Sequence, residues 1–307
     1  LKIGPGDEVI LPSFTIISCA NSIVRAGAKP IVVDADTQNW NMRTDLIEDK
    51  ITPKTVAIMM VHIYGLPVDV DPILDIAKKH NLAVIEDAAE IIGGTYKDKP
   101  CGSFGTISTF SFYPNKHITT GEGGMVFTND FSLAERCKKL RNLCFEKEKR
   151  FVHEEIGWNY RMTNMQAALG LAQLESLENN IRKKIKIGEL YNKYLSELPG
   201  IKLPLRKTSY ARNIYWVYGI LLEKRLGKAE KFMKSLSDLG VGNRPFFYPI
   251  NKQPVLKKLG FFNDVQDRLF SEDLYDQGFY IPSGLSLNEE KINYVVTQLN
   301  NLLLGLL

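Results

Sequence analysis

Apolar runs alternate with amphipathic stretches through the first half of the chain. Four runs are typical of buried strands: EVIL (8–11), PIVV (30–33), TVAIMMV (55–61) and LAVIED (82–87). The stretches between them include residues 15–27 and 71–80, which have helical character. Because strands that are apolar on both faces occur in parallel sheets covered by helices, this alternation predicts an α/β fold with helices on both sides of the sheet.

The pattern changes at residues 106–128, where two strand-like runs follow each other closely, which favours a mixed, mostly parallel sheet. A long helical pattern then begins near Thr163 and meets no proline before Pro199. Such a helix often joins two lobes. We therefore expect a large domain at residues 1–175, followed by a linking helix and a smaller domain at residues 176–307.

The last third of the chain mixes strand and helix signals, which predicts a small α+β lobe. A strand is expected within residues 213–222, and residues 244–254 form a loop rich in proline and aromatic residues. Ser286 and Glu289 fit a capping box at the start of the final helix. The charged run at 182–186 is typical of a solvated helix face.

Composition narrows the class of protein. The chain has 307 residues, 44% hydrophobic and 24% charged, with a net charge of +4 and no basic block, which argues against nucleic acid as a partner. No apolar run is long enough to span a membrane. Four cysteines have neither metal-ligand spacing nor a disulfide framework: Cys19, Cys101, Cys137 and Cys144. We expect reduced thiols, no metal and a cytoplasmic protein.

Asp87 is the first candidate for chemistry, since it ends an apolar strand of an open α/β sheet. Ligands bind beyond the carboxyl ends of such strands. A carboxylate in this position needs a partner. It could cap a helix or form a structural ion pair, or it could face a cationic ring nitrogen.

Lys116 follows another strand-like run, between Ser111 and the glycine-rich segment GEGG at 121–124. Taken alone it would be a solvated surface lysine. A lysine amine, a carboxylate such as Asp87 and a hydroxyl are together what pyridoxal phosphate requires for its aldehyde, its ring nitrogen and its phosphate. Glycines also occur in tight turns that bind no ligand, so GEGG by itself is weak support.

Seven segments occur in a fixed order that extends over the whole chain: GDEVILPSFT, AGAKPIVVD, VHIYGLPVDVDPI, VIEDAAE, GSFGTISTFSFYPNKHITTGEGGMVFTND, GWNYRMTNMQAALGLAQLE and RPFFYPI. Together they resemble the DegT/DnrJ/EryC1/StrS family of sugar aminotransferases, which have the aspartate aminotransferase-like fold of pyridoxal-phosphate-dependent transferases.

The resemblance implies roles for individual residues. Lys116 would form the Schiff base with pyridoxal phosphate and then move the proton, and Asp87 would pair with the pyridine nitrogen. Ser111 would bind the phosphate. Asn159 would reach the phosphate bound by a neighbouring subunit, so the active unit would be a homodimer with shared sites. Glu90 occupies a position near the ring hydroxyl where much of the family has glutamine, and there it would be protonated or turned away.

The sequence departs from the family at two places. Ile16 stands where an aromatic residue often stacks on the cofactor ring. The phosphate-binding glycine-threonine loop of the family would lie upstream of Leu1, and the chain does not begin with methionine. We therefore expect that N-terminal sequence is missing and that this chain alone binds the cofactor poorly.

The resemblance also implies substrates. These would be glutamate as amino donor and a nucleotide-linked 4-keto-6-deoxy sugar, aminated for surface polysaccharide synthesis. His62, Arg244 and Tyr248 are candidate substrate contacts, although a core histidine and plain loop packing would also explain them. Two rivals stay open: a related dehydratase, whose branch carries histidine at the Schiff-base position, and a non-catalytic truncated paralogue or regulator.

Overall fold

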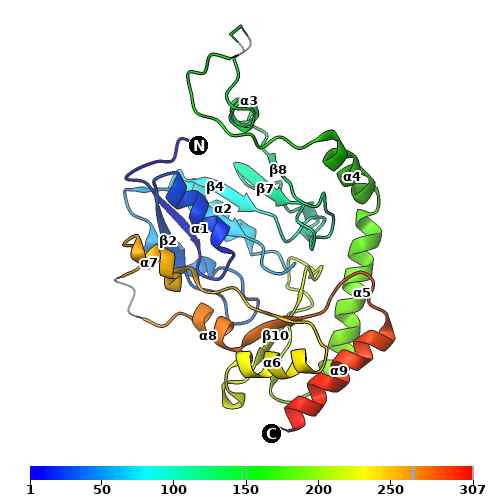
Figure 1. The fold of residues 1–307 in the computed structure, drawn as a ribbon. Helices are drawn as coiled ribbons and strands as arrows, with labels where there is room; N and C mark the ends of the chain where they lie inside the picture. Colours follow the sequence, from blue (N-terminus) through cyan, green and yellow to red (C-terminus); the bar gives the residue numbers. More distant parts are fainter. Residues whose placement is uncertain (147, 150, 264–266, 306–307) are drawn as a thin grey trace.

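A computed structural model describes residues 1–146, 148–149, 151–263 and 267–305. Its main feature is a six-stranded sheet with the order β2-β1-β3-β4-β7-β8 (Figure 1). The first five strands in this order pair in parallel, and β8 is antiparallel to β7. The strands are β1 (Glu8–Pro12), β2 (Lys29–Val33), β3 (Thr55–Val61), β4 (Ala83–Asp87), β7 (Ile107–Ser111) and β8 (Gly124–Phe127). The predicted mixed, mostly parallel sheet is confirmed.

Helices cover both faces of this sheet, as the apolar strands predicted. Helix α1 (Ile17–Arg25) packs Ala20 and Ile23 into the same core as Val9 and Leu11 of β1. Helix α2 (Val70–Lys79) instead joins the core on the other face, which holds Ile10 of β1. Because successive strand residues point to opposite faces, one strand serves both cores.

The second lobe contains a four-stranded antiparallel sheet in the order β11-β12-β10-β9. Its strands are β9 (Ile201–Lys202), β10 (Tyr218–Leu222), β11 (Arg244–Pro245) and β12 (Gly278–Ile281). Residues of α5 (Leu177–Leu195), α6 (Ala229–Asp238) and α9 (Glu289–Leu304) share one apolar core with this sheet. The expected α+β character is therefore confirmed, while the division at residue 175 stays a prediction.

Two local predictions were wrong. The long helical pattern after Thr163 is divided at Ser176 into α4 (Asn164–Glu175) and α5, so the absence of proline did not ensure one continuous helix. Helix α9 is capped by Asn288, whose side chain accepts a hydrogen bond from the Lys291 N–H at 3.0 Å. The capping box expected at Ser286 therefore does not form, because the helix begins at Glu289.

The segment after β8 leaves the body of the molecule. Helix α3 (Phe131–Arg141) and the chain that follows it extend away from the sheet before returning through α4 (Figure 1). Neither α3 nor α4 contains a buried residue. This part of the chain consequently exposes many large apolar side chains in the single subunit.

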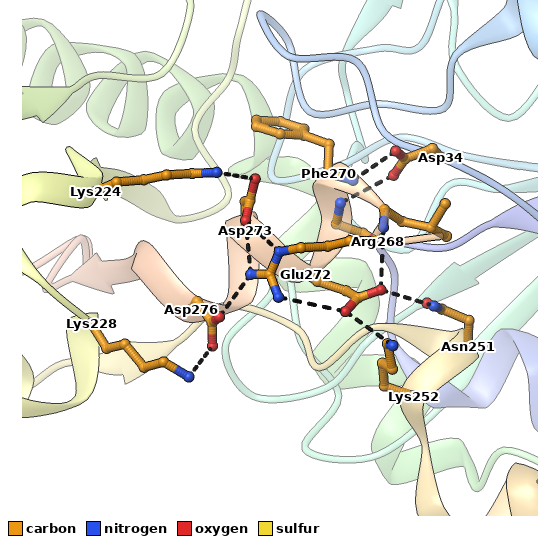
Figure 2. A network of polar contacts seen from close by, with 12 residues as sticks. Asp34, Lys224, Lys228, Asn251, Lys252, Arg268, Phe270, Glu272, Asp273 and Asp276 are labelled. Carbon is orange, nitrogen blue, oxygen red and sulfur yellow. Dashed lines mark hydrogen bonds and ion pairs between the residues drawn. The ribbon is translucent and has the colours of Figure 1, made fainter. Parts of the chain in front are cut away.

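A polar network joins α8 (Phe270–Gln277) to the large sheet (Figure 2). Asp34, directly after β2, accepts hydrogen bonds from the N–H groups of Phe270 at 2.7 Å and Ser271 at 3.0 Å. Carboxylates are favourable at helix N-termini, where backbone N–H groups lack partners. Asp34 thus fixes α8 to the first lobe.

Strand β5 (Thr95–Tyr96) pairs with β6 (Lys99–Pro100) in a separate two-stranded sheet, and α7 (Pro254–Lys258) precedes α8. The remaining short turns are 3₁₀ helices: η1 (Thr44–Leu46), η2 (Glu48–Lys50), η3 (Lys224–Leu226) and η4 (Ile250–Lys252). In the described part of the chain, we find no helix with the length and apolarity that crossing a bilayer requires.

Candidate active site

Asp87 lies at the carboxyl end of β4, and both of its carboxylate oxygens have partners. The thiol of Cys19, at the start of α1, donates to Oδ2 at 3.2 Å, and the N–H of Ala89 donates to Oδ1 at 3.0 Å. The side chain is half-buried. Asp87 is therefore an oriented carboxylate at the end of the strand where ligands bind in this type of sheet.

Lys116 lies in the loop between β7 and β8, with its side chain half-buried. Its Nζ atom is 3.5 Å from the centroid of the Trp216 ring. Burial lowers the pKa of Lys116, while the negative charges of Glu90 and Asp87 act in the opposite direction. Lys116, Asp87 and Glu90 thus share one site, which we call the Lys116 cluster.

Glycines shape the loop that carries Lys116. Gly121 and Gly123 have φ angles of 77° and 148°, which side chains disfavour. A Cβ atom at Gly123 would lie 2.6 Å from Thr120 Oγ1, so the turn has no room for one. These requirements of the turn account for both glycines without any ligand.

Glu90 is 4% exposed and accepts a hydrogen bond from the Tyr64 N–H at 2.9 Å. Burial raises the pKa of its carboxyl group to about 7, although Lys116 and the Tyr64 N–H oppose this shift. Near neutral pH a large fraction of Glu90 is consequently protonated. In that form it can donate a hydrogen bond, which is the requirement for a carboxyl group beside a phenolate oxygen.

Ser111 and Asn159 occupy different surroundings. Ser111 is half-buried at the end of β7, where its Oγ accepts a hydrogen bond from the Tyr113 N–H at 3.3 Å. Asn159 is exposed on the segment between α3 and α4, paired with Asn142 through an isolated β-bridge. Ser111 thus ends the strand next to the one that Asp87 ends, while Asn159 belongs to the extended segment.

His62 is a core histidine in this structure. Its side chain has no exposed surface, Nε2 lies 3.0 Å from Glu86 Oε1, and Nδ1 accepts from the Val68 N–H at 3.2 Å. Both ring nitrogens are occupied, so no atom is left for a substrate. The geometry favours the structural alternative for His62.

Arg244 and Tyr248 lie on the second lobe. Arg244 is exposed on β11 and pairs in register with Tyr280 of β12. Burial raises the pKa of Tyr280, and the charges of both Arg244 and Glu90 act on it. Tyr280 is thus close enough to both Arg244 and Glu90 to sense their charges. Tyr248 is partly exposed and packs edge-to-face on Tyr275, with ring centroids 4.7 Å apart.

The model of the DegT/DnrJ/EryC1/StrS aminotransferase family matches residues 1–300. The chain belongs to this family. It is 42% identical over 300 residues to GDP-perosamine synthase of Escherichia coli O157:H7, an alignment that covers 98% of this chain and 80% of the relative. It is 41% identical over 304 residues to GDP-perosamine synthase of Caulobacter vibrioides, covering 99% and 81% of the two chains.

Solved structures agree with the family assignment. The aminotransferase TlmJ from Streptoalloteichus hindustanus superposes with a TM-score of 0.91 at 26% identity, over 99% of this chain and 81% of that one. The predicted transferase fold is therefore confirmed. Among the described residues, no group of three or more His, Cys, Asp or Glu side chains is arranged to hold a metal ion.

Three residues near the Lys116 cluster could not be identified from the sequence, because no motif marks them. They are Cys19, Trp216 and Lys184. Lys184 lies in the charged run that we expected to be solvated, yet it is 5% exposed. Its Nζ donates to the carbonyls of Trp216 and Ser283, both at 2.7 Å. The expectation was wrong for Lys184 because this face of α5 packs against the chain before β10 and after β12.

Proposed function

We propose that this chain is a pyridoxal-phosphate-dependent aminotransferase that converts a nucleotide-linked 4-keto-6-deoxy sugar to the 4-amino sugar, with glutamate as amino donor. The observation that carries the proposal is the oriented carboxylate of Asp87 in the same site as the half-buried amine of Lys116. The two relatives named GDP-perosamine synthase support a GDP-linked sugar. We propose that the amino sugar is used for surface polysaccharide.

The residues present fit pyridoxal phosphate. Burial favours the neutral amine of Lys116, which is the form that attacks an aldehyde. Asp87 offers a fixed carboxylate that would keep a ring nitrogen protonated. Glu90 would donate to the ring hydroxyl in its protonated form, and the Ser111 hydroxyl would bind the phosphate. When bound, the cofactor supplies an aldehyde and a ring that withdraws electrons.

Lys116 has two tasks in this proposal. Its amine would first hold the cofactor, and after the donor amine has displaced it, the same amine would take a proton from the substrate carbon and return it. Both tasks need an amine that loses its proton near neutral pH, and burial moves the pKa of Lys116 in that direction.

A homodimer is the second part of the proposal. Large apolar residues on β8, α3, α4 and the segment between α3 and α4 are exposed in the single chain: Met125, Val126, Phe127, Phe131, Ile156, Trp158, Tyr160, Met165, Leu169, Leu171 and Leu174. A high density of exposed large apolar residues on neighbouring elements is typical of protein interfaces. A second copy covering this surface would bring Asn159, which lies within it, to the neighbouring site.

Substrate recognition would fall to the second lobe. The exposed guanidinium of Arg244, which pairs in register with Tyr280, would suit the phosphates of a nucleotide sugar, and the exposed ring of Tyr248 could stack on a base or sugar. The free cysteines of the described chain support a reducing, cytoplasmic location for such an enzyme.

The decisive assay incubates the purified protein and pyridoxal phosphate with glutamate and a panel of GDP-, UDP- and dTDP-linked 4-keto-6-deoxy sugars. The proposal expects an amino sugar, detected by mass spectrometry, and none with Lys116→Ala. A deoxygenated sugar would instead identify a dehydratase. No product with any sugar, from folded protein that carries the cofactor, would favour the non-catalytic alternative.

A further inference from the structure

The amine of Lys116 lies against the face of an indole ring. Its Nζ lies 3.5 Å from the centroid of Trp216, well inside the range in which a cation is attracted to an aromatic face. Tryptophan gives the strongest contact of this kind. Trp216 is 5% exposed, so little water competes with the contact.

Trp216 is held in place by both lobes. Its N–H donates to the Tyr64 carbonyl at 3.1 Å, and its carbonyl accepts from Lys184 Nζ at 2.7 Å. The indole Nε1–H donates to the carbonyl of Asn115 at 2.9 Å, which fixes the ring relative to the residue before the lysine. The orientation of the indole face is therefore set by hydrogen bonds at the backbone and at the ring.

Lys184 stabilises this arrangement through neutral acceptors. Its described partners are the carbonyls of Trp216 and Ser283 and the Ser283 hydroxyl, at 2.7, 2.7 and 3.3 Å. A buried ammonium group is costly unless it is hydrogen-bonded, so Lys184 requires these acceptors. Its contacts therefore hold α5 against the segments before β10 and after β12. The position of Trp216 thus depends on how the second lobe packs.

Several groups act on the Lys116 amine besides the ring. Burial favours the neutral form, and the negative charges of Glu90 and Asp87 favour the protonated form. The neighbouring His117 is buried and its pKa is lowered to about 3, so it remains neutral near pH 7. The indole face also favours the ammonium form of Lys116.

We infer that Trp216 is a positioning residue whose indole face holds the ammonium form of Lys116 in one place whenever this amine is not bonded to the cofactor. The inference rests on the proposed function of Lys116. Once the displaced amine has taken the proton from the substrate carbon, the ring would hold the resulting ammonium beside that carbon until the proton is returned. It would also limit the fraction of neutral amine in the cofactor-free protein.

The test compares Trp216→Leu and Trp216→Phe with the wild-type chain, all without cofactor. Each protein is mixed with pyridoxal phosphate over a range of pH, the rate of covalent bond formation is followed by absorbance, and borohydride reduction with peptide mass analysis assigns the label to Lys116. Loss of a contact worth about 0.5–2 kcal/mol raises the neutral fraction at fixed pH about 2- to 30-fold.

The pH midpoint of the rate is the diagnostic quantity. We expect it to fall in Trp216→Leu and to fall less in Trp216→Phe, which keeps an aromatic face. Trp40→Phe is the matched control, because Trp40 is buried but packs on Phe246, and its midpoint should equal that of the wild type. A purely structural role would slow the reaction at every pH without moving the midpoint.

Equal midpoints in all proteins would overturn the inference, while labelling of Lys116 would still support the proposed function. If Lys116 is not labelled, the proposed function fails. The inference is then decided on the cofactor-free protein, whose lysines are labelled by ¹³C reductive methylation. The NMR resonance that is absent in Lys116→Arg belongs to Lys116, and its titration gives the pKa of this lysine in each protein. If Trp216→Leu does not fold, Trp216→Phe alone decides.

Discussion

Cys19 donates a hydrogen bond from its thiol to Asp87, with Sγ 3.2 Å from Oδ2. The pKa of the thiol is raised well above its usual value by burial and by the charge of Asp87, so the sulfur keeps its proton. Because the Ala89 N–H fixes Oδ1, each carboxylate oxygen has its own donor. The helix on one face of the sheet therefore orients the carboxylate at the strand end.

Replacing Cys19 with alanine should loosen Asp87 without removing it. One hydrogen bond of about 1 kcal/mol corresponds to about fivefold weaker cofactor binding. Cys19→Ser retains a donor and should bind nearly as the wild type. Titration of each protein with pyridoxal phosphate by absorbance gives the dissociation constants. Equal constants for Cys19→Ala and the wild type would mean that the thiol does not orient Asp87.

Glu90 should make the protein less stable as the pH rises. Its folded pKa of about 7 lies above the usual 4.5, so its stabilising contribution is fully present below pH 4.5 and is lost as the pH rises through 7. Glu90→Gln keeps an oxygen for the Tyr64 N–H but does not titrate. Urea denaturation measures the free energy of unfolding of both proteins at each pH. As the pH rises from below 4.5 to above 7, the difference between Glu90→Gln and the wild type should shift in favour of the variant by up to about 3 kcal/mol.

Glu86 provides a control in which stability should change with pH in the opposite direction. Burial would raise its pKa, but hydrogen bonds from His62 and from the N–H groups of Gly102 and Gly105 lower it below 4.5. Its stabilising contribution is present above that pH and is lost as the pH falls. Glu86→Gln should accordingly lose more stability at pH 7 than in acid. The same pH slope in both variants would contradict the assignment.

Asp34→Ala should destabilise the protein by removing the acceptor for the Phe270 and Ser271 N–H groups at the start of α8 (Figure 2). Loss of such a cap costs about 1–2 kcal/mol, measurable by chemical denaturation. Asp276→Ala is the matched control in the same network, since it breaks ion pairs to Lys228 and Arg268 at the surface. Ion pairs that keep contact with solvent contribute about 0–1 kcal/mol, so a larger loss in Asp276→Ala than in Asp34→Ala would contradict the prediction.

Ile156→Asp should convert the proposed dimer to a monomer. Ile156 is 90% exposed in the single chain, on the segment that also carries Asn159. A buried carboxylate at an interface is costly unless it is paired. Light scattering gives the mass of the variant and of the control Leu304→Asp, whose residue is 62% exposed at the end of α9. A wild-type monomer, or an unaffected dimer in Ile156→Asp, would refute the assignment of this surface.

Strand patterns alone could place the chemistry at one edge of the sheet. The apolar run that ends at Asp87 predicted a carboxylate at the carboxyl end of a parallel strand, where β4 ends. The pattern named Asp87 because it ends the run, but it did not show what surrounds Asp87 and the neighbouring Glu86. Alternation along the strand gives the two carboxylates different partners: Glu86 faces His62 and the loop N–H groups, and Asp87 faces Cys19.

The sequence could not predict contacts between segments that are far apart along the chain. Trp216 is 100 positions from Lys116, and nothing local distinguishes it from a strand tryptophan. Lys184 belongs to a run of charged residues, and only the packing of α5 against the second sheet buries it. Similarly, His62 could not be assigned to the core until Glu86 and Val68 were found at its ring nitrogens.

The most direct test of the central claim is to mix the protein with pyridoxal phosphate, reduce with borohydride and identify the modified lysine by peptide mass spectrometry. We predict one stoichiometric label at Lys116, loss of that label in Lys116→Ala, and a visible absorption band that disappears with it. A label on Lys184 or spread over surface lysines, unchanged in Lys116→Ala, would contradict the account.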